Sequence, residues 1–161
     1  MGYGYHESMS RPNSTPQEMV LYFTSDVNAN VKVEIPGTGW IRNYVVAANT
    51  VTESDTMPKS GIYDSRLIKE AIYNTGIHIT SDNPIVAYAH IYNSSVSGAT
   101  LLFPVTTLGQ DYYSLNFTQR SFIANSNSWV YVIATEDNTE VEIIPSGNTL
   151  THSANKSYYD T

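Results

Sequence analysis

The chain has 161 residues and no cysteine, and its 15 acidic and 8 basic residues give a formal net charge of −7. The length favours one domain with a sizeable core, and the lack of cysteine excludes disulfides, thiolate metal ligands and cysteine nucleophiles. An acidic chain with 14% charged residues is a poor match to nucleic acid, because phosphate binding needs clustered basic residues. The chain contains no run of eighteen apolar residues, so we predict no membrane span.

The N-terminal residues 1–18 contain Gly2, Gly4, Pro12 and Pro16 without hydrophobic periodicity, which predicts a flexible tail or linker. From Met19 onward, apolar and polar residues alternate in segments separated by turn residues. We therefore predict a domain over 19–161. Its expected strands are 19–23, 31–35, 41–47, 76–80, 85–92, 99–105, 112–117, 129–135 and 139–144.

One segment, 64–74, departs from this alternation. Asp64 or Ser65 could cap a short helix there, because Leu67, Ile68, Ala71 and Ile72 follow helical spacing. The whole pattern predicts an all-β fold of sandwich-like antiparallel sheets, with about nine strands and at most one short helix.

The segment 76–92 carries the clearest strand pattern, and the Ser-Asp-Asn-Pro sequence at 81–84 predicts a hairpin turn within it. If residues whose numbers sum to 164 face one another, Ile79 lies opposite Ile85 and Ile77 opposite Ala87. Those residues would form a core face. The outer face would carry His78, Val86, Tyr88, His90 and Tyr92.

A weak internal echo relates 26–37, which ends in Pro36-Gly37, to 137–147, which ends at Gly147. Two related half-sandwiches would explain it, and in that case the second copy stops short at 161 and the chain is an excerpt of a longer polypeptide. Alternatively, both segments reuse Asp or Asn before a strand and Pro or Gly after it.

Several ordered blocks also resemble a known family. They are 33–37 (Val-Glu-Ile-Pro-Gly), 76–84, 88–90 (Tyr-Ala-His), 98–105 (Gly-Ala-Thr-Leu-Leu-Phe-Pro-Val), 108–113 and 132–139 (Val-Ile-Ala-Thr-Glu-Asp-Asn-Thr). Over roughly 19–159 the chain resembles the N-terminal domain of IgGFc-binding protein. The resemblance implies a β-rich, non-enzymatic, extracellular binding or adhesion module, and similarity to surface-protein domains of Bacteroidetes implies a bacterial, secreted or cell-surface protein. It identifies no ligand residues.

Candidate reactive groups do not converge. In the predicted hairpin, His78 and His90 would lie about 13 Å apart along the strand, too far apart to share a zinc ion even with Asp82 nearby. The nucleophile-elbow sequence Gly-x-Ser-x-Gly does not occur. We therefore predict no catalytic residue, no metal site and no cofactor.

Two groups of acidic or amide side chains can be explained without a catalytic or calcium-binding role. Glu140 and Glu142 would lie about 7 Å apart on one strand face, a spacing compatible with glycoside hydrolysis, but alternation with Val141 explains them as a solvated face. The oxygens of Asp26 and Asn28 could face calcium, but turns at strand ends account for them.

The residues expected to bind a partner are Tyr88, His90 and Tyr92, together with Tyr112, Trp129 and Tyr131 from other strands. Rigid aromatic rings with polar tips suit a protein or glycan partner, although the same rings could cover a second sheet or fill the core. Two other functions remain open: a structural building block that assembles through exposed strand edges, and a glycan-cleaving enzyme that uses Glu140 and Glu142.

Overall fold

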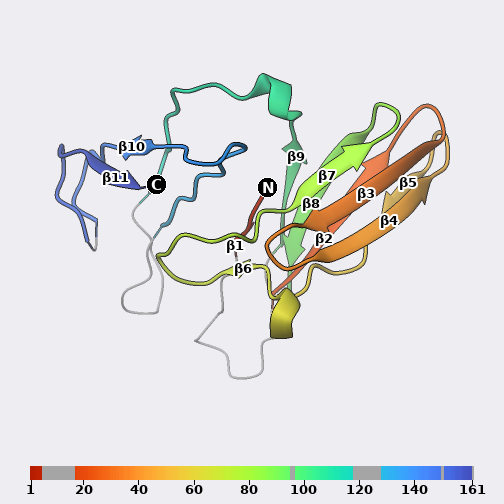
Figure 1. The fold of residues 1–161 in the computed structure, drawn as a ribbon, viewed down its shortest axis with the longest axis horizontal. Coiled ribbons are helices and arrows are strands. Elements are labelled where there is room, and N and C mark those ends of the chain that lie inside the picture. Colours follow the sequence, from red (N-terminus) through yellow and green to blue (C-terminus); the bar gives the residue numbers. More distant parts are fainter. Residues whose placement is uncertain (5–16, 95–96, 118–127, 150, 161) are drawn as a thin grey trace.

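The computed structural model describes residues 1–4, 17–94, 97–117, 128–149 and 151–160 (Figure 1). In these residues the regular elements are β-strands and two short 3-10 turns, Gly61–Tyr63 and Val105–Thr107. The prediction of an all-β fold with sandwich-like antiparallel sheets is confirmed.

The first large sheet has four antiparallel strands in the order β5-β2-β8-β9. Their bounds are Val51–Glu53 for β5, Glu18–Thr24 for β2, Val86–Tyr92 for β8 and Ser97–Leu102 for β9. Strand β2 is central because it pairs with β8 along its whole length and with β5 at one end. Its core face carries Met19, Leu21 and Phe23, and Val20 is buried on the opposite face.

The second large sheet has three strands in the order β4-β3-β7. Their bounds are Trp40–Val46 for β4, Ala29–Ile35 for β3 and His78–Ser81 for β7. A tight turn joins β3 to β4, in which the Gly39 amide donates to the Ile35 carbonyl at 3.0 Å. Gly39 has a φ of 74°, a conformation that glycine adopts without steric cost.

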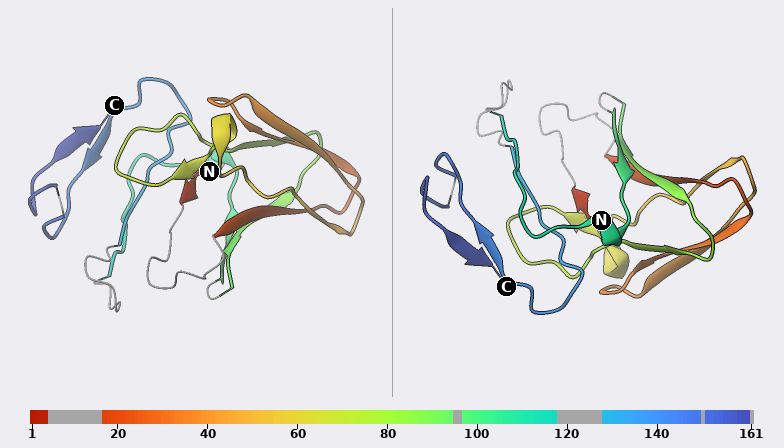
Figure 2. Two further views of the ribbon diagram at one scale, coloured as in Figure 1. Left: turned by 90° about the horizontal axis from the view of Figure 1, so that it is seen from below. Right: turned by 90° about the horizontal axis from the view of Figure 1, so that it is seen from above.

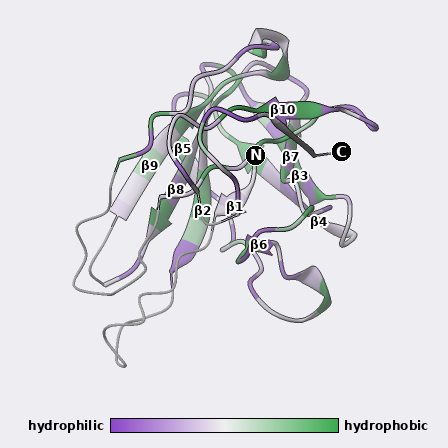
Figure 3. Cartoon of the chain, turned by 90° about the vertical axis from the view of Figure 1, so that its left-hand side faces the viewer, coloured by the Kyte–Doolittle hydropathy of each residue, from purple (hydrophilic) through white to green (hydrophobic). Residues whose placement is uncertain are grey.

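The core lies between these two sheets, which face each other in Figure 2. The four-stranded sheet contributes Met19, Leu21, Phe23, Ala87 and Ala89; the three-stranded sheet contributes Ala29, Val31, Val33, Ile35, Trp40 and Val46. In Figure 3 the apolar residues follow the strands of both sheets and β10. Complete burial of a side chain such as Leu or Phe stabilises the fold by about 1.5–3 kcal/mol, so these strands hold the sandwich together.

The hairpin predicted for 76–92 is wrong. Strand β7 pairs with β3, and β8 pairs with β2 and β9, so residues 81–84 cross from one sheet to the other. The crossing is held by the β2–β3 connection and by β3 itself: Ser25 Oγ donates to the Pro84 carbonyl at 2.7 Å, and the Asn30 amide of β3 donates to Asp82 Oδ1 at 2.7 Å. Burial along β8 nevertheless follows the expected alternation, with Ala87 buried and Tyr88 exposed.

Two smaller sheets complete the described structure. Strand β1 (Tyr3–Gly4) runs parallel to β6 (Arg66–Leu67), and β10 (Val141–Ile143) pairs antiparallel with β11 (Tyr158–Asp160). Tyr3 is fully buried and its hydroxyl donates to the Gln17 carbonyl at 2.7 Å. The first four residues therefore pack within the fold, and residues 5–16 of the predicted tail lie outside the described residues.

Three expected elements do not form. The helix predicted for 64–74 is wrong: Arg66 and Leu67 are extended in β6, and the Tyr73 hydroxyl accepts from the amides of Ile68 and Lys69. The strands predicted for 112–117 and 129–135 are also wrong, because neither segment belongs to a sheet. An apolar, strand-like sequence becomes a strand only where another strand supplies its hydrogen bonds.

Candidate binding surface

Aromatic side chains gather on the outer face of the four-stranded sheet. We call Tyr22, Tyr88, His90 and Tyr92 the aromatic row. Strand β2 contributes Tyr22, which lies opposite Tyr88 of β8 in the ladder, and His90 and Tyr92 follow along β8 at two-residue spacing. Because alternate residues of a strand share a face, the four rings point the same way.

Three rings of the aromatic row, those of Tyr22, His90 and Tyr92, are in contact. The centroids of His90 and Tyr92 are 4.9 Å apart at an interplanar angle of 29°, and those of Tyr22 and His90 are 6.0 Å apart at 34°. Aromatic pairs at such distances stabilise one another by about 0.5–1.5 kcal/mol beyond simple burial. The rings are therefore held in place before any partner arrives.

Polar groups border the aromatic row. His90 Nε2 lies 2.8 Å from Ser97 Oγ of β9, which fixes the orientation of the imidazole. Desolvation, followed by the neighbouring Glu53 carboxylate, raises the pKa of the Tyr22 hydroxyl, so this group stays protonated and can donate a hydrogen bond. At the end of the row, Lys59 forms an ion pair with Glu18.

A second aromatic pair lies elsewhere, beside β1. The rings of Trp129 and Tyr131 stack with centroids 5.3 Å apart, and the Tyr131 hydroxyl donates to the Gly2 carbonyl at 3.4 Å. Glycine is required at position 4, because a Cβ there would lie 1.8 Å from a ring carbon of Trp129. The stacked position of Trp129 therefore depends on the absence of a side chain at position 4 of β1.

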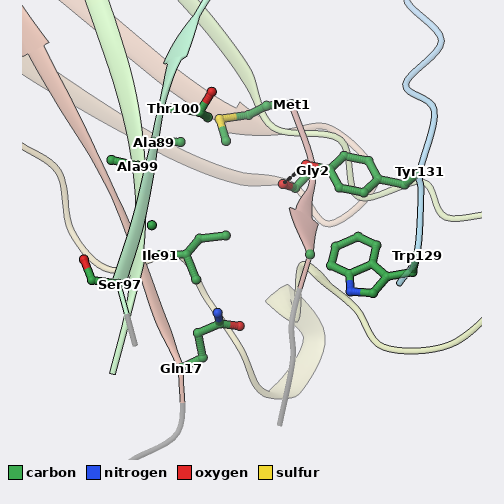
Figure 4. A pocket seen from close by; sticks show the side chains of 12 residues that line it. Met1, Gly2, Gln17, Ala89, Ile91, Ser97, Ala99, Thr100, Trp129 and Tyr131 are labelled. Carbon is green, nitrogen blue, oxygen red and sulfur yellow. Dashed lines mark hydrogen bonds between the residues drawn. The ribbon is translucent and has the colours of Figure 1, made fainter. Parts of the chain in front are cut away.

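The Trp129–Tyr131 pair lines a cleft of about 430 Å³. Figure 4 shows the two rings next to Gly2, with Ile91 of β8 and Ser97 of β9 across the cleft. Small residues of β9, among them Gly98, line the same wall. The cleft and the aromatic row involve opposite faces of β8, because Ile91 has the buried parity whereas Tyr88, His90 and Tyr92 have the outer parity. They meet at Ser97, which lines the cleft and contacts His90.

The structure therefore divides the six predicted binding residues. It brings Tyr88, His90 and Tyr92 together on the sheet face, and it places Trp129 and Tyr131 together at the cleft. Tyr112 belongs to neither group: it is 66% exposed, and its hydroxyl accepts from the Gly109 amide at 2.7 Å. Whether any of the six binds a partner stays a prediction.

Tyr22 is the member of the aromatic row that the sequence analysis missed. The alternation of Met19, Leu21 and Phe23 in the core placed Tyr22 on the opposite face of β2. What the sequence lacked was the pairing of β2 with β8, which sets Tyr22 beside Tyr88. The sequence pattern therefore indicated which face of β2 carries Tyr22, but it did not indicate that β8 is the neighbouring strand.

The other candidate groups are separated by the fold. His78 lies in the three-stranded sheet with its Nδ1 3.1 Å from Glu34 Oε1, whereas His90 lies in the four-stranded sheet. Hydrogen bonds from the Asn30 backbone and side-chain amides lower the pKa of Asp82. Within the described residues, no three His, Asp or Glu side chains gather in a way that could hold a metal ion.

Comparison with known proteins places part of the chain in a family context. Residues 98–160 match the family model of IgGFc binding protein. The match includes all of β9 except Ser97, together with Trp129, Tyr131 and the β10–β11 pair, and it does not include the aromatic row. Neither the curated proteins nor the solved structures contain a match to the chain. No helix in the part of the chain that the structure describes has the length and hydropathy needed to cross a membrane.

Proposed function

We propose that this chain is a non-enzymatic binding module of an extracellular or cell-surface bacterial protein. The observation that carries the proposal is the aromatic row, a contiguous set of rings on an open sheet face. Interface centres are enriched in tyrosine, because its rigid ring supplies contact area at a small entropic cost and its hydroxyl supplies a hydrogen bond. The match of 98–160 to IgGFc binding protein supports the same class of function.

The partner that we propose is an extracellular protein, with a glycan as the second possibility. A protein partner fits because the rings stand on a two-strand surface and those of Tyr22, His90 and Tyr92 contact one another, so a partner would meet a continuous surface. A glycan would instead need free ring faces for stacking. Immunoglobulin Fc is the first candidate to test, because the matching family carries it in its name.

Binding should be measured against immobilised immunoglobulin Fc and against a glycan array, using the intact chain. Tyr88→Ala and Tyr92→Ala should each weaken binding, by roughly tenfold or more if the rings are anchors. Tyr63→Ala is the matched control, because Tyr63 is 42% exposed and Tyr88 is 41% exposed, yet Tyr63 lies on a 3-10 turn away from the row. Equal loss in all three variants, or turnover of a substrate by the pure chain, would refute the proposal.

A further inference from the structure

An exposed carboxylate lies beside the aromatic row, on the neighbouring edge strand of the sheet. Glu53 of β5 is the ladder partner of Tyr22 on one side, and Tyr88 of β8 is its ladder partner on the other. Residues that lie opposite each other in a ladder share a face of the sheet, so the carboxylate and the two rings are neighbours on the outer face. We call Glu53, Tyr22 and Tyr88 the Glu53 patch.

The carboxylate of the Glu53 patch has no cationic partner among the described residues. Lysine and arginine side chains form four ion pairs in this part of the chain. The carboxylates in those pairs belong to Glu18, Glu34, Asp55 and Asp64. Glu53 is exposed and takes part in none of them, so the patch presents a negative charge next to aromatic rings.

Glu53 keeps room for a further donor although it interacts with Tyr22. Desolvation, the charge of Glu53 and a side-chain hydrogen bond with Glu53 together raise the pKa of the Tyr22 hydroxyl, which therefore stays protonated and donates to the carboxylate. A carboxylate has about four lone-pair sites, so this one hydrogen bond leaves acceptor positions open. The Tyr88 ring is 41% exposed and is open to a partner as well.

The chain contains one example of such an arrangement with its cation in place. The guanidinium carbon of Arg42 lies 5.1 Å from the centre of the Trp40 ring, and Arg42 Nε lies 3.3 Å from Asp55 Oδ2. A ring and a carboxylate thus hold one guanidinium together. The planar group suits both contacts, because it stacks on a ring and presents its N–H groups as a fork to a carboxylate. The Glu53 patch supplies rings and a carboxylate in the same way.

We propose that the Glu53 patch binds an arginine side chain of the protein partner. The guanidinium lies against the rings of Tyr22 and Tyr88 and donates to the Glu53 carboxylate. Lysine fits less well, because its compact ammonium cannot form the fork, and the net charge of −7 on the chain attracts a cationic partner segment. This inference rests on the proposed binding function of the aromatic row, and it names the chemistry that the partner brings.

The probe is N-acetyl-arginine N-methylamide, titrated into the intact, isotopically labelled chain and followed by NMR. We expect saturable shift changes at the amides of Tyr22, Glu53 and Tyr88. The citrulline derivative has a similar shape but a neutral urea group, so it should bind roughly fivefold more weakly, and the lysine derivative should also bind more weakly. Equal binding of the citrulline or the lysine derivative would overturn the proposal, as would shift changes confined to other acidic segments such as 136–140.

Two variants with the same change in net charge separate the patch from general attraction. Glu53→Gln should weaken binding of the arginine derivative by roughly fivefold, because it removes the charge but keeps an acceptor for Tyr22. Glu140→Gln is the matched control and should leave binding unchanged, since Glu140 is also exposed and lies just before β10, away from the four-stranded sheet (Figure 1). The amide spectra would verify that both variants fold, and equal effects of the two variants would refute the proposal.

The arginine inference and the proposed function can fail separately. If a partner binds through Tyr88 and Tyr92 but Glu53→Gln changes neither that binding nor arginine binding, the inference is wrong and the proposed function stands. If the arginine derivative binds at the patch while Tyr88→Ala and Tyr92→Ala leave partner binding unchanged, the guanidinium site stands and the proposed role of the aromatic row is wrong.

Discussion

Ser54 extends the pairing between β2 and β5 beyond the last ladder residue. Its amide donates to the Leu21 carbonyl at 2.9 Å, and its side-chain Oγ accepts from the Leu21 amide at 2.9 Å. The same Oγ donates to the Asp55 carbonyl at 2.7 Å. Leu21 is fully buried, so water cannot easily replace the hydroxyl as the acceptor for its amide.

Ser54→Ala removes this acceptor together with the donor to the Asp55 carbonyl, and it changes the packing little because the change in volume is small. A buried donor left without a partner costs about 1–3 kcal/mol, so we expect the free energy of unfolding to fall by about 2 kcal/mol. For a domain of this size, the corresponding fall in Tm is roughly 4–8 °C.

The test is urea denaturation of the wild type, Ser54→Ala and a control, Ser60→Ala. Ser60 is exposed and its side chain makes no cap hydrogen bond to the following turn, so its variant should stay within about 0.5 kcal/mol of the wild type. The urea m-value should be unchanged in both variants, because the surface exposed on unfolding is the same. A Ser54→Ala protein as stable as the control would mean that the Leu21 amide finds another acceptor, and the argument would be wrong.

Three further changes test other parts of the fold. Phe23→Ala should lower the free energy of unfolding by about 3–5 kcal/mol in urea denaturation, because the ring is fully buried between the sheets; a loss below 1 kcal/mol would contradict the core assignment. Gly37→Ala should cost about 1–3 kcal/mol, since a Cβ would lie 1.6 Å from the Asn74 carbonyl oxygen, whereas Gly109→Ala meets no atom within 4 Å and should be neutral. Hydrogen bonds from Asn30 hold the folded-state pKa of Asp82 below its ordinary value, so its stabilising effect is present above the unfolded-state pKa and is lost as the pH falls through the folded-state pKa. Asp82→Asn should therefore flatten the loss of stability in acid, and an unchanged acid limb would refute its role.

Alternation along single strands predicted the larger part of the sandwich. Strands β2, β3, β4, β8 and β9 lie within a few residues of their expected positions, and Ala87 and Tyr88 face the expected sides. Alternation indicates which side chains of a strand face the core. It does not indicate which strand pairs with it, because the two-residue period is the same for every pairing. It could not distinguish a hairpin at 81–84 from a crossing between sheets, because Asp82 and Pro84 suit both.

The same reasoning explains the mixed outcome at the candidate binding surface. Tyr88, His90 and Tyr92 share one strand, so their common face followed from spacing alone. Trp129 and Tyr131 were expected near them, but their position depends on Gly2 and on Gly4 of β1, a two-residue strand too short to show any period. Short strands that are held by long-range packing leave almost no signal in the local sequence.

The most informative disagreement concerns 129–135. Residues 19–23 and 129–133 are both apolar or aromatic throughout, yet Val20 is 1% exposed and Val130 is 48% exposed. The pattern predicts burial for both segments, but β2 is paired within a sheet whereas 129–135 forms no ladder in the part of the chain that the structure describes. If amide exchange at 129–135 proved as slow in the isolated chain as in β2, this argument would lose its basis, because the segment would already be paired.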